Sequence, residues 1–167
     1  MEQKLILISG SPCVGKTTMA EELYQLFDNS AYLDGDWVWH VNPFSVKDPR
    51  LRDGDKNCSF VLNTYLELGF EYVFYSSVVL TDQNIREKII NGINEKSYKI
   101  IGFSLMCSKK TLSERHRNRG DENDVSFYWL DLGPYFDDYV INTDNKTPIE
   151  IAKEIKKLIL ESTPKSL

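Results

Sequence analysis

Residues 10–18 read Gly-Ser-Pro-Cys-Val-Gly-Lys-Thr-Thr, and this stretch constrains the fold more than any other part of the sequence. It follows an apolar, β-rich run at residues 4–9 and precedes a helix-forming run at residues 16–27. Glycines at positions 10 and 15 permit backbone angles in which successive N–H groups point at one anion. The N-terminus of the following helix adds its positive end to the same place. The sequence therefore predicts a strand, a phosphate-binding loop and a helix, in that order.

The spacing of glycine, four residues, glycine, lysine and threonine fits the Walker A pattern. Lys16 is expected to reach the β- and γ-phosphates of a nucleotide, and the hydroxyl of Thr17 to ligate Mg²⁺. Cys13 is either an oxidation-sensitive thiol or a small filler that contributes its backbone, and we favour the filler. The predicted nucleotide-binding residues of the loop are Gly10, Ser11, Pro12, Cys13, Val14, Gly15, Lys16, Thr17 and Thr18.

Strand-like and helix-like segments alternate along the rest of the chain. Predicted strands cover residues 4–9, 32–33, 72–80, 98–105 and 139–142, and predicted helices cover residues 16–27, 57–68, 82–95, 109–119 and 148–161. Residues 37–55 are expected to be irregular because Pro43, Pro49 and Gly54 break them. Five strands alternating with helices predict an α/β fold with a parallel sheet covered on both faces.

Composition limits the kind of protein this can be. A chain of 167 residues is long enough for one compact domain without disulfides. Its three widely spaced cysteines favour free thiols in a reducing cytoplasm. The apolar runs are too short to span a bilayer, and the residues after Met1 lack the apolar stretch of a secretory signal. A net charge of −5 argues against duplex nucleic acid as a partner, since such proteins usually carry a basic stripe.

An acidic motif follows the phosphate-binding loop. Tyr-Leu-Asp-Gly-Asp at residues 32–36 ends the predicted second strand and looks like the Asp-x-Asp element of the P-loop kinases of small molecules. That family includes shikimate, gluconate, adenylylsulfate, adenylate and nucleoside kinases and antibiotic phosphotransferases. The resemblance implies a three-layer α/β/α P-loop NTPase fold, sheet order 2-3-1-4-5, and the cofactors ATP and Mg²⁺. It assigns Asp34 to the magnesium shell and Asp36 to deprotonating the acceptor, although the two could exchange roles.

An arginine-rich segment follows the predicted fourth strand. Residues 112–121 resemble the lid of these kinases, in which arginines on a mobile helix close over the triphosphate. Arg115 and Arg119 are four residues apart and therefore share one helix face. The resemblance gives both a catalytic role beside Lys16 and Asp36, and it gives Arg115 a role in nucleotide binding. A solvated charged helix is the alternative.

The acceptor is expected between residues 37 and 58, within a single domain spanning residues 1–167 whose lid covers about 109–125. This segment carries aromatic and charged side chains that could line a pocket. Arginines there would suit an acceptor with a phosphate or carboxylate, or could be solvated loop charges. The predicted substrate-binding residues are Asp34, Asp36, Trp37, His40, Arg50 and Arg52.

Two functions remain open on the sequence alone. The favoured one is a cytoplasmic ATP- and Mg²⁺-dependent phosphotransferase that moves the γ-phosphate to a hydroxyl or a phosphate of a small molecule. It is expected to be a monomer or homodimer and to bind no membrane. Its partner would be a small-molecule acceptor such as a nucleoside, nucleotide, sugar acid or antibiotic. The alternative is a nucleotide-binding switch without efficient phosphotransfer. A motor-type ATPase is disfavoured because the third strand runs through Ser76 and Ser77, and acid appears only at Asp82.

Overall fold

The protein is built on one parallel sheet. The computed structural model describes residues 2–45, 47–95, 97–120 and 124–162, without the side chain of Arg52. The strands are β1 (Gln3–Gly10), β2 (Ser30–Asp34), β3 (Tyr72–Ser76), β4 (Tyr98–Met106) and β5 (Tyr139–Asn142). They pair in parallel in the order β2-β3-β1-β4-β5. The predicted α/β fold class and strand order are therefore confirmed.

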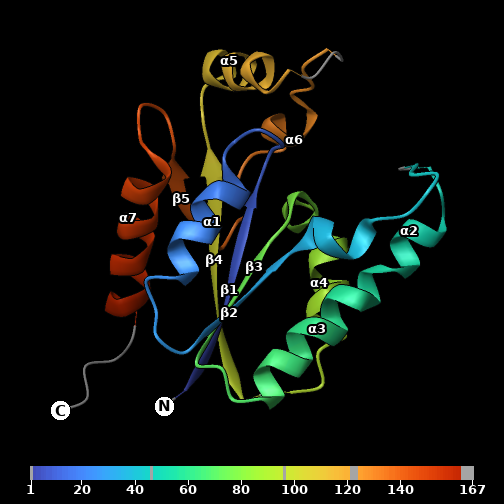
Figure 1. Ribbon diagram of the computed structural model, residues 1–167, viewed down its shortest axis with the longest axis vertical. Coiled ribbons are helices and arrows are strands. Elements are labelled where there is room, and N and C mark those ends of the chain that lie inside the picture. The colour runs from blue at the N-terminus through green and yellow to red at the C-terminus, as the bar shows by residue number, and fades with distance from the viewer. Residues whose placement is uncertain (1, 46, 96, 121–123, 163–167) are drawn as a thin grey trace.

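Helices cover both faces of the sheet. Helices α1 (Lys16–Tyr24) and α7 (Pro148–Glu161) lie on one side, and α3 (Asp55–Glu67) and α4 (Gln83–Asn91) lie on the other (Figure 1). Alternate residues of β1 point to opposite faces, as a strand requires. Ile6 and Ile8 are buried with α1 and α7, whereas Leu5 and Leu7 are buried with α3 and α4. Within the described ranges, no helix is long and apolar enough to cross a membrane.

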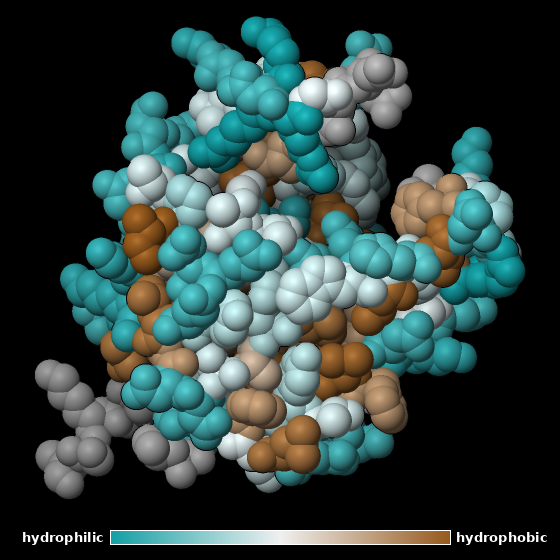
Figure 2. All heavy atoms as spheres, in the orientation of Figure 1, coloured by the Kyte–Doolittle hydropathy of each residue, from teal (hydrophilic) through white to brown (hydrophobic). Residues whose placement is uncertain are grey.

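The remaining elements gather near the carboxyl ends of the strands. They are the 3₁₀ helices η1 (Gly35–Trp39) and η2 (Val78–Thr81) and the helices α2 (Arg50–Asp53), α5 (Lys109–Arg119) and α6 (Tyr128–Asp131). In Figure 1, α5 lies beyond the ends of β1 and β4, and α2 lies on an arm that projects from the body. Hydrophilic side chains cover α5 in Figure 2. Ligands of open α/β sheets bind at this edge.

Several element boundaries differ from the sequence prediction. The third strand ends at Ser76 rather than residue 80, because the Ser77 hydroxyl accepts from the Val79 N–H and starts η2. Helix α1 ends at Tyr24, three residues early. Residues expected to be irregular contain η1, α2 and the start of α3. Of the predicted lid, residues 121–123 lie outside the described part of the chain.

Candidate active site

The phosphate-binding loop joins β1 to α1 through two glycines in left-handed conformations. Gly10 has φ +144° and Gly15 has φ +102°. A Cβ on Gly10 would lie 2.7 Å from the carbonyl oxygen of Leu105, so a side chain at this position would collide with β4. The loop therefore needs glycine at position 10 both for its backbone angle and for its close approach to the neighbouring strand.

Lys16 lies at the first position of α1, with its ammonium group folded back over the loop. Its Nζ donates a hydrogen bond to the Ser11 carbonyl oxygen at 2.9 Å. Burial lowers the pKa of Lys16 to about 8, against the opposing effect of the nearby carboxylates of Asp36 and Asp34. An arriving polyphosphate would stabilise the charged form of this ammonium. The position suits a lysine that neutralises phosphate.

Asp34 is the most firmly held carboxylate of the site. It is buried at the end of β2 and accepts from the Thr17 hydroxyl at 2.7 Å and from the Tyr32 hydroxyl at 3.2 Å. Its other oxygen accepts from the Asp36 N–H at 2.9 Å. Burial raises the pKa of Tyr32, so its hydroxyl remains a donor. These bonds fix one carboxylate oxygen directly beside the Thr17 hydroxyl.

Asp36, two residues further on, projects into the same cavity but is exposed rather than buried. The cavity has a volume of about 420 Å³ and lies between the loop, the end of β2, the start of η2 and α5. Part of its wall comes from residues far apart in the sequence. Its lining residues are Pro12, Cys13, Gly15, Lys16, Thr17, Thr18, Asp34, Asp36, Ser77, Val78, Arg115 and Arg119.

The two arginines predicted to share a helix face both line this cavity, but their contacts differ. Arg115 donates to the Val14 carbonyl oxygen at 2.8 Å and to the carbonyl and hydroxyl of Thr143 at 2.8 and 3.0 Å. It therefore fastens α5 to the loop and to the turn after β5. Arg119 reaches over the loop, with its Nη1 4.0 Å from the sulfur of Cys13.

The other predicted acceptor residues are spread over neighbouring surfaces. Trp37 is half exposed and lines a separate hollow with Tyr32. Arg50 lines a cavity on the arm and is paired with Asp48. His40 is exposed, and the side chain of Arg52 lies outside the described part. Asp34 and Asp36 are thus the two predicted acceptor residues that the structure brings into the loop cavity.

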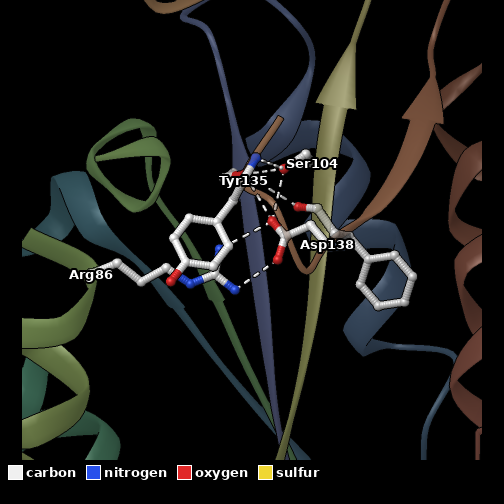
Figure 3. A network of polar contacts seen from close by, with 6 residues as sticks. Arg86, Ser104, Tyr135 and Asp138 are labelled. Atoms are coloured by element: carbon white, nitrogen blue, oxygen red, sulfur yellow. Dashed lines mark hydrogen bonds and ion pairs between the residues drawn. The ribbon is translucent and has the colours of Figure 1, made fainter. Parts of the chain in front are cut away.

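A buried polar network behind the loop has no counterpart in the sequence analysis (Figure 3). Arg86 of α4 forms two hydrogen bonds with Asp138, at 3.0 and 2.7 Å, and both side chains are almost fully buried. Asp138 also accepts from Ser104 at 2.7 Å and from Ser9, the residue before the loop, at 3.3 Å. The Tyr135 ring stacks on the Arg86 guanidinium at 3.8 Å. No motif joins these residues, so only the fold reveals them.

The order of strand, loop, helix and acidic strand end, with this sheet topology, defines a P-loop protein with the fold of small-molecule kinases. Its family is equally clear: residues 6–129 match the AAA domain family, and the chain belongs to it. No curated protein matches the sequence.

Solved structures share the fold across nearly the whole chain. A Deinococcus radiodurans tunicamycin resistance protein superposes with a TM-score of 0.74 at 16% identity, covering 94% of this chain and 95% of that one. Shikimate kinase from Acinetobacter baumannii gives 0.63 at 17%, covering 98% and 96%. The APS kinase of Mycobacterium tuberculosis, in complex with AMPPNP and APS, gives 0.64 at 12%, covering 95% and 98%. At such identities the likeness shows the fold.

Proposed function

We propose that this protein is an ATP- and Mg²⁺-dependent phosphotransferase that moves the γ-phosphate to a hydroxyl of a small molecule. One observation carries the proposal: the Walker A lysine, the Thr17–Asp34 pair and the exposed carboxylate of Asp36 line one cavity. A triphosphate held by the loop would present its γ-phosphate to that carboxylate. The structural neighbours described as shikimate and APS kinases support the same reaction class.

The loop end of the cavity suits a nucleotide with its metal. Mg²⁺ prefers oxygen ligands and is usually held by one or two carboxylates together with substrate phosphates. The Thr17 hydroxyl and the Asp34 carboxylate, 2.7 Å apart, supply such oxygens. The described residues hold no cluster of three His, Cys, Asp or Glu side chains, which fits a metal held mainly by phosphate. When bound, the ion would neutralise charge on the β- and γ-phosphates.

Asp36 is the proposed general base. Its carboxylate would take the proton of the acceptor hydroxyl as that oxygen bonds to the γ-phosphorus and the bond to ADP breaks. The burial of Asp34, held by three donors, and the exposure of Asp36 support Asp34 as metal partner and Asp36 as base. Lys16 and Arg119 would stabilise negative charge on the transferring group.

The proposal also assigns a role to each segment around the loop cavity. Residues 1–167 act as one domain, with the acceptor held by the segment 37–58 and the triphosphate covered by α5 and the residues that follow it. Arg115 would support the nucleotide by holding Val14 and Thr143 in place. The free cysteines support the cytoplasm as its compartment.

Replacement of the proposed base tests the function. Asp36→Asn should lower phosphoryl transfer about a hundredfold while leaving ATP affinity nearly unchanged, because general bases contribute about that much. Transfer is measured as ADP release with nucleosides, sugar acids, shikimate and antibiotics as acceptors, and the phosphorylated product is identified by mass. Asp28→Asn, at an exposed carboxylate beyond α1, is the matched control. An Asp36→Asn rate within a few-fold of the unaltered protein would remove Asp36 from catalysis.

A further inference from the structure

A second cavity, of about 470 Å³, lies on the arm and is lined by residues that follow Asp36 in the chain, beginning with Val38. Its walls come from the end of η1, residues 41–43, 45 and 48, α2 and the start of α3. Apolar side chains form much of it, namely Val38, Trp39, Val41, Pro43 and Leu51. Hydrophobic residues also gather at this arm in Figure 2. A hollow of this size and lining is typical of small-molecule sites.

The indole ring of Trp39 forms one wall of the cavity. It packs against Gly54 so closely that a Cβ at Gly54 would overlap the ring. The six-membered ring of the indole therefore lies against the backbone at the start of α3, and the side chain lines the cavity. A fixed aromatic surface of this kind binds planar or apolar groups with little loss of side-chain freedom.

The polar groups of the cavity carry little unbalanced charge. Asn42, Ser45 and Asn57 are neutral hydrogen-bonding residues. Arg50 donates from Nε to both oxygens of Asp48, at 3.0 and 3.1 Å, and from Nη2 at 2.6 Å. The described charged side chains that line the cavity therefore neutralise each other. An anionic ligand would lose its water here without gaining an uncompensated cation among them.

Helix η1 connects this cavity to the proposed base. In a 3₁₀ helix, side chains three residues apart lie one above the other, and the rise is about 2 Å per residue. Asp36 and Trp39 are three residues apart in η1, a spacing of about 6 Å along the axis of an ideal 3₁₀ helix, with Asp36 lining the loop cavity and Trp39 the cavity on the arm. A molecule packed on Trp39 can therefore present a hydroxyl group to Asp36 if a short linker joins that hydroxyl to the rest of the molecule.

We propose that this cavity holds the body of an uncharged acceptor, an aromatic or alicyclic alcohol with neutral hydrogen-bonding substituents. This inference rests on the proposed function and names its substrate class. On the sequence alone, Arg50 either binds an acceptor phosphate or carboxylate or is a solvated loop charge. The inference favours the second, because Arg50 is paired with Asp48.

The test compares two probes that differ by one carboxylate. Binding of 3-phenylpropan-1-ol and of 4-(3-hydroxypropyl)benzoate is measured by ligand-observed NMR with ADP and Mg²⁺ present. The neutral alcohol should bind about tenfold more tightly, and Trp39→Ala should weaken it about tenfold, as expected for loss of an aromatic contact. Phe60→Ala, at an exposed aromatic of α3 outside the cavity, should change it less than about twofold. Unchanged ADP affinity shows that each variant is folded.

The outcomes separate this inference from the proposed function. Equal or tighter binding of the benzoate overturns the inference, and Arg52→Gln then shows whether that side chain supplies the cation. An unchanged affinity of the Trp39→Ala variant for the alcohol also overturns it. Neither result touches phosphoryl transfer, which is measured separately through Asp36→Asn. Conversely, selective binding of the neutral alcohol would stand even if transfer failed.

Discussion

Replacing Asp138 with leucine would leave the guanidinium of Arg86 buried without its partner. Both side chains are almost fully enclosed, at 4% exposure for Arg86 and 0% for Asp138. Two hydrogen bonds join them, and Asp138 also accepts from Ser104 and Ser9. The network links α4 to the strand that enters the phosphate-binding loop, so its loss affects both stability and the loop.

The size of the effect follows from these contacts. Each hydrogen bond between charged groups contributes about 1.5–3 kcal/mol, and breaking one side of a buried ion pair costs about 3–5 kcal/mol. We therefore expect Asp138→Leu to lower the free energy of unfolding by about 3–5 kcal/mol. For a domain of this size that corresponds to a fall in Tm of roughly 6–20 °C. Total stabilities are about 5–15 kcal/mol, so the variant would be marginal.

A double-mutant cycle separates the energy of the lost Arg86–Asp138 interaction from the cost of leaving the Arg86 charge buried without a partner. Unfolding in urea is followed by circular dichroism for the unaltered protein, Asp138→Leu, Arg86→Met and the double variant. Because the double variant leaves no uncompensated charge, it should be more stable than Asp138→Leu by about 1–3 kcal/mol. A single-variant cost below about 1 kcal/mol, or strictly additive costs, would refute the reasoning.

Three further predictions concern the loop cavity and the phosphate-binding loop. ATP should bind about tenfold more weakly per pH unit above pH 8, because burial lowers the pKa of Lys16 to about 8 and its ammonium group loses its charge as pH rises. Calorimetry at pH 7–9.5 measures the affinity, and in a Lys16→Arg variant the affinity should not fall with pH in this way. Arg115→Gln should lose about 1–3 kcal/mol of stability in thermal unfolding, because Arg115 bonds to Val14 and Thr143. Arg119→Gln should lose turnover but less stability, because Arg119 is exposed; equal stability losses would contradict this. Gly10→Ala should abolish ATP binding, because its Cβ would collide with Leu105; retained affinity would contradict it.

The sequence predicted those features of the fold and the site that depend on residues close together in the chain. The loop at residues 10–18 needs glycine backbone angles and a following helix, and both are readable from spacing. The helix predicted at residues 148–161 is confirmed as α7, and its start is also held by short-range contacts, because Thr147 and Glu150 exchange hydrogen bonds. Arg115 and Arg119 share a face for the same reason of helical period, and both line the loop cavity.

Much of what the sequence could not predict depends on contacts between distant residues, and the rest on short-range bonds that have several possible partners. Arg86 and Asp138 are 52 positions apart, and the fold alone brings them together. On the arm, the absence of a side chain at Gly54 lets Trp39 lie against the start of α3 and line the cavity there. No sequence pattern predicts this contact. Arg50 was expected either to bind the acceptor or to be a solvated loop charge, and in the structure it is paired with the carboxylate of Asp48. The third strand ends early because the hydroxyl of Ser77 caps η2.

The central claim is that the loop cavity transfers the γ-phosphate of ATP to a hydroxyl placed at Asp36. The most direct measurement is the formation of phosphorylated product from ATP, Mg²⁺ and a neutral aromatic alcohol, followed by ³¹P NMR and mass spectrometry. The account predicts a phosphate ester that Lys16→Ala does not form, that Asp36→Asn forms about a hundredfold more slowly, and that chelation of magnesium prevents. Product formed at an undiminished rate by Lys16→Ala, or no ester from any alcohol despite tight ATP binding, would contradict it.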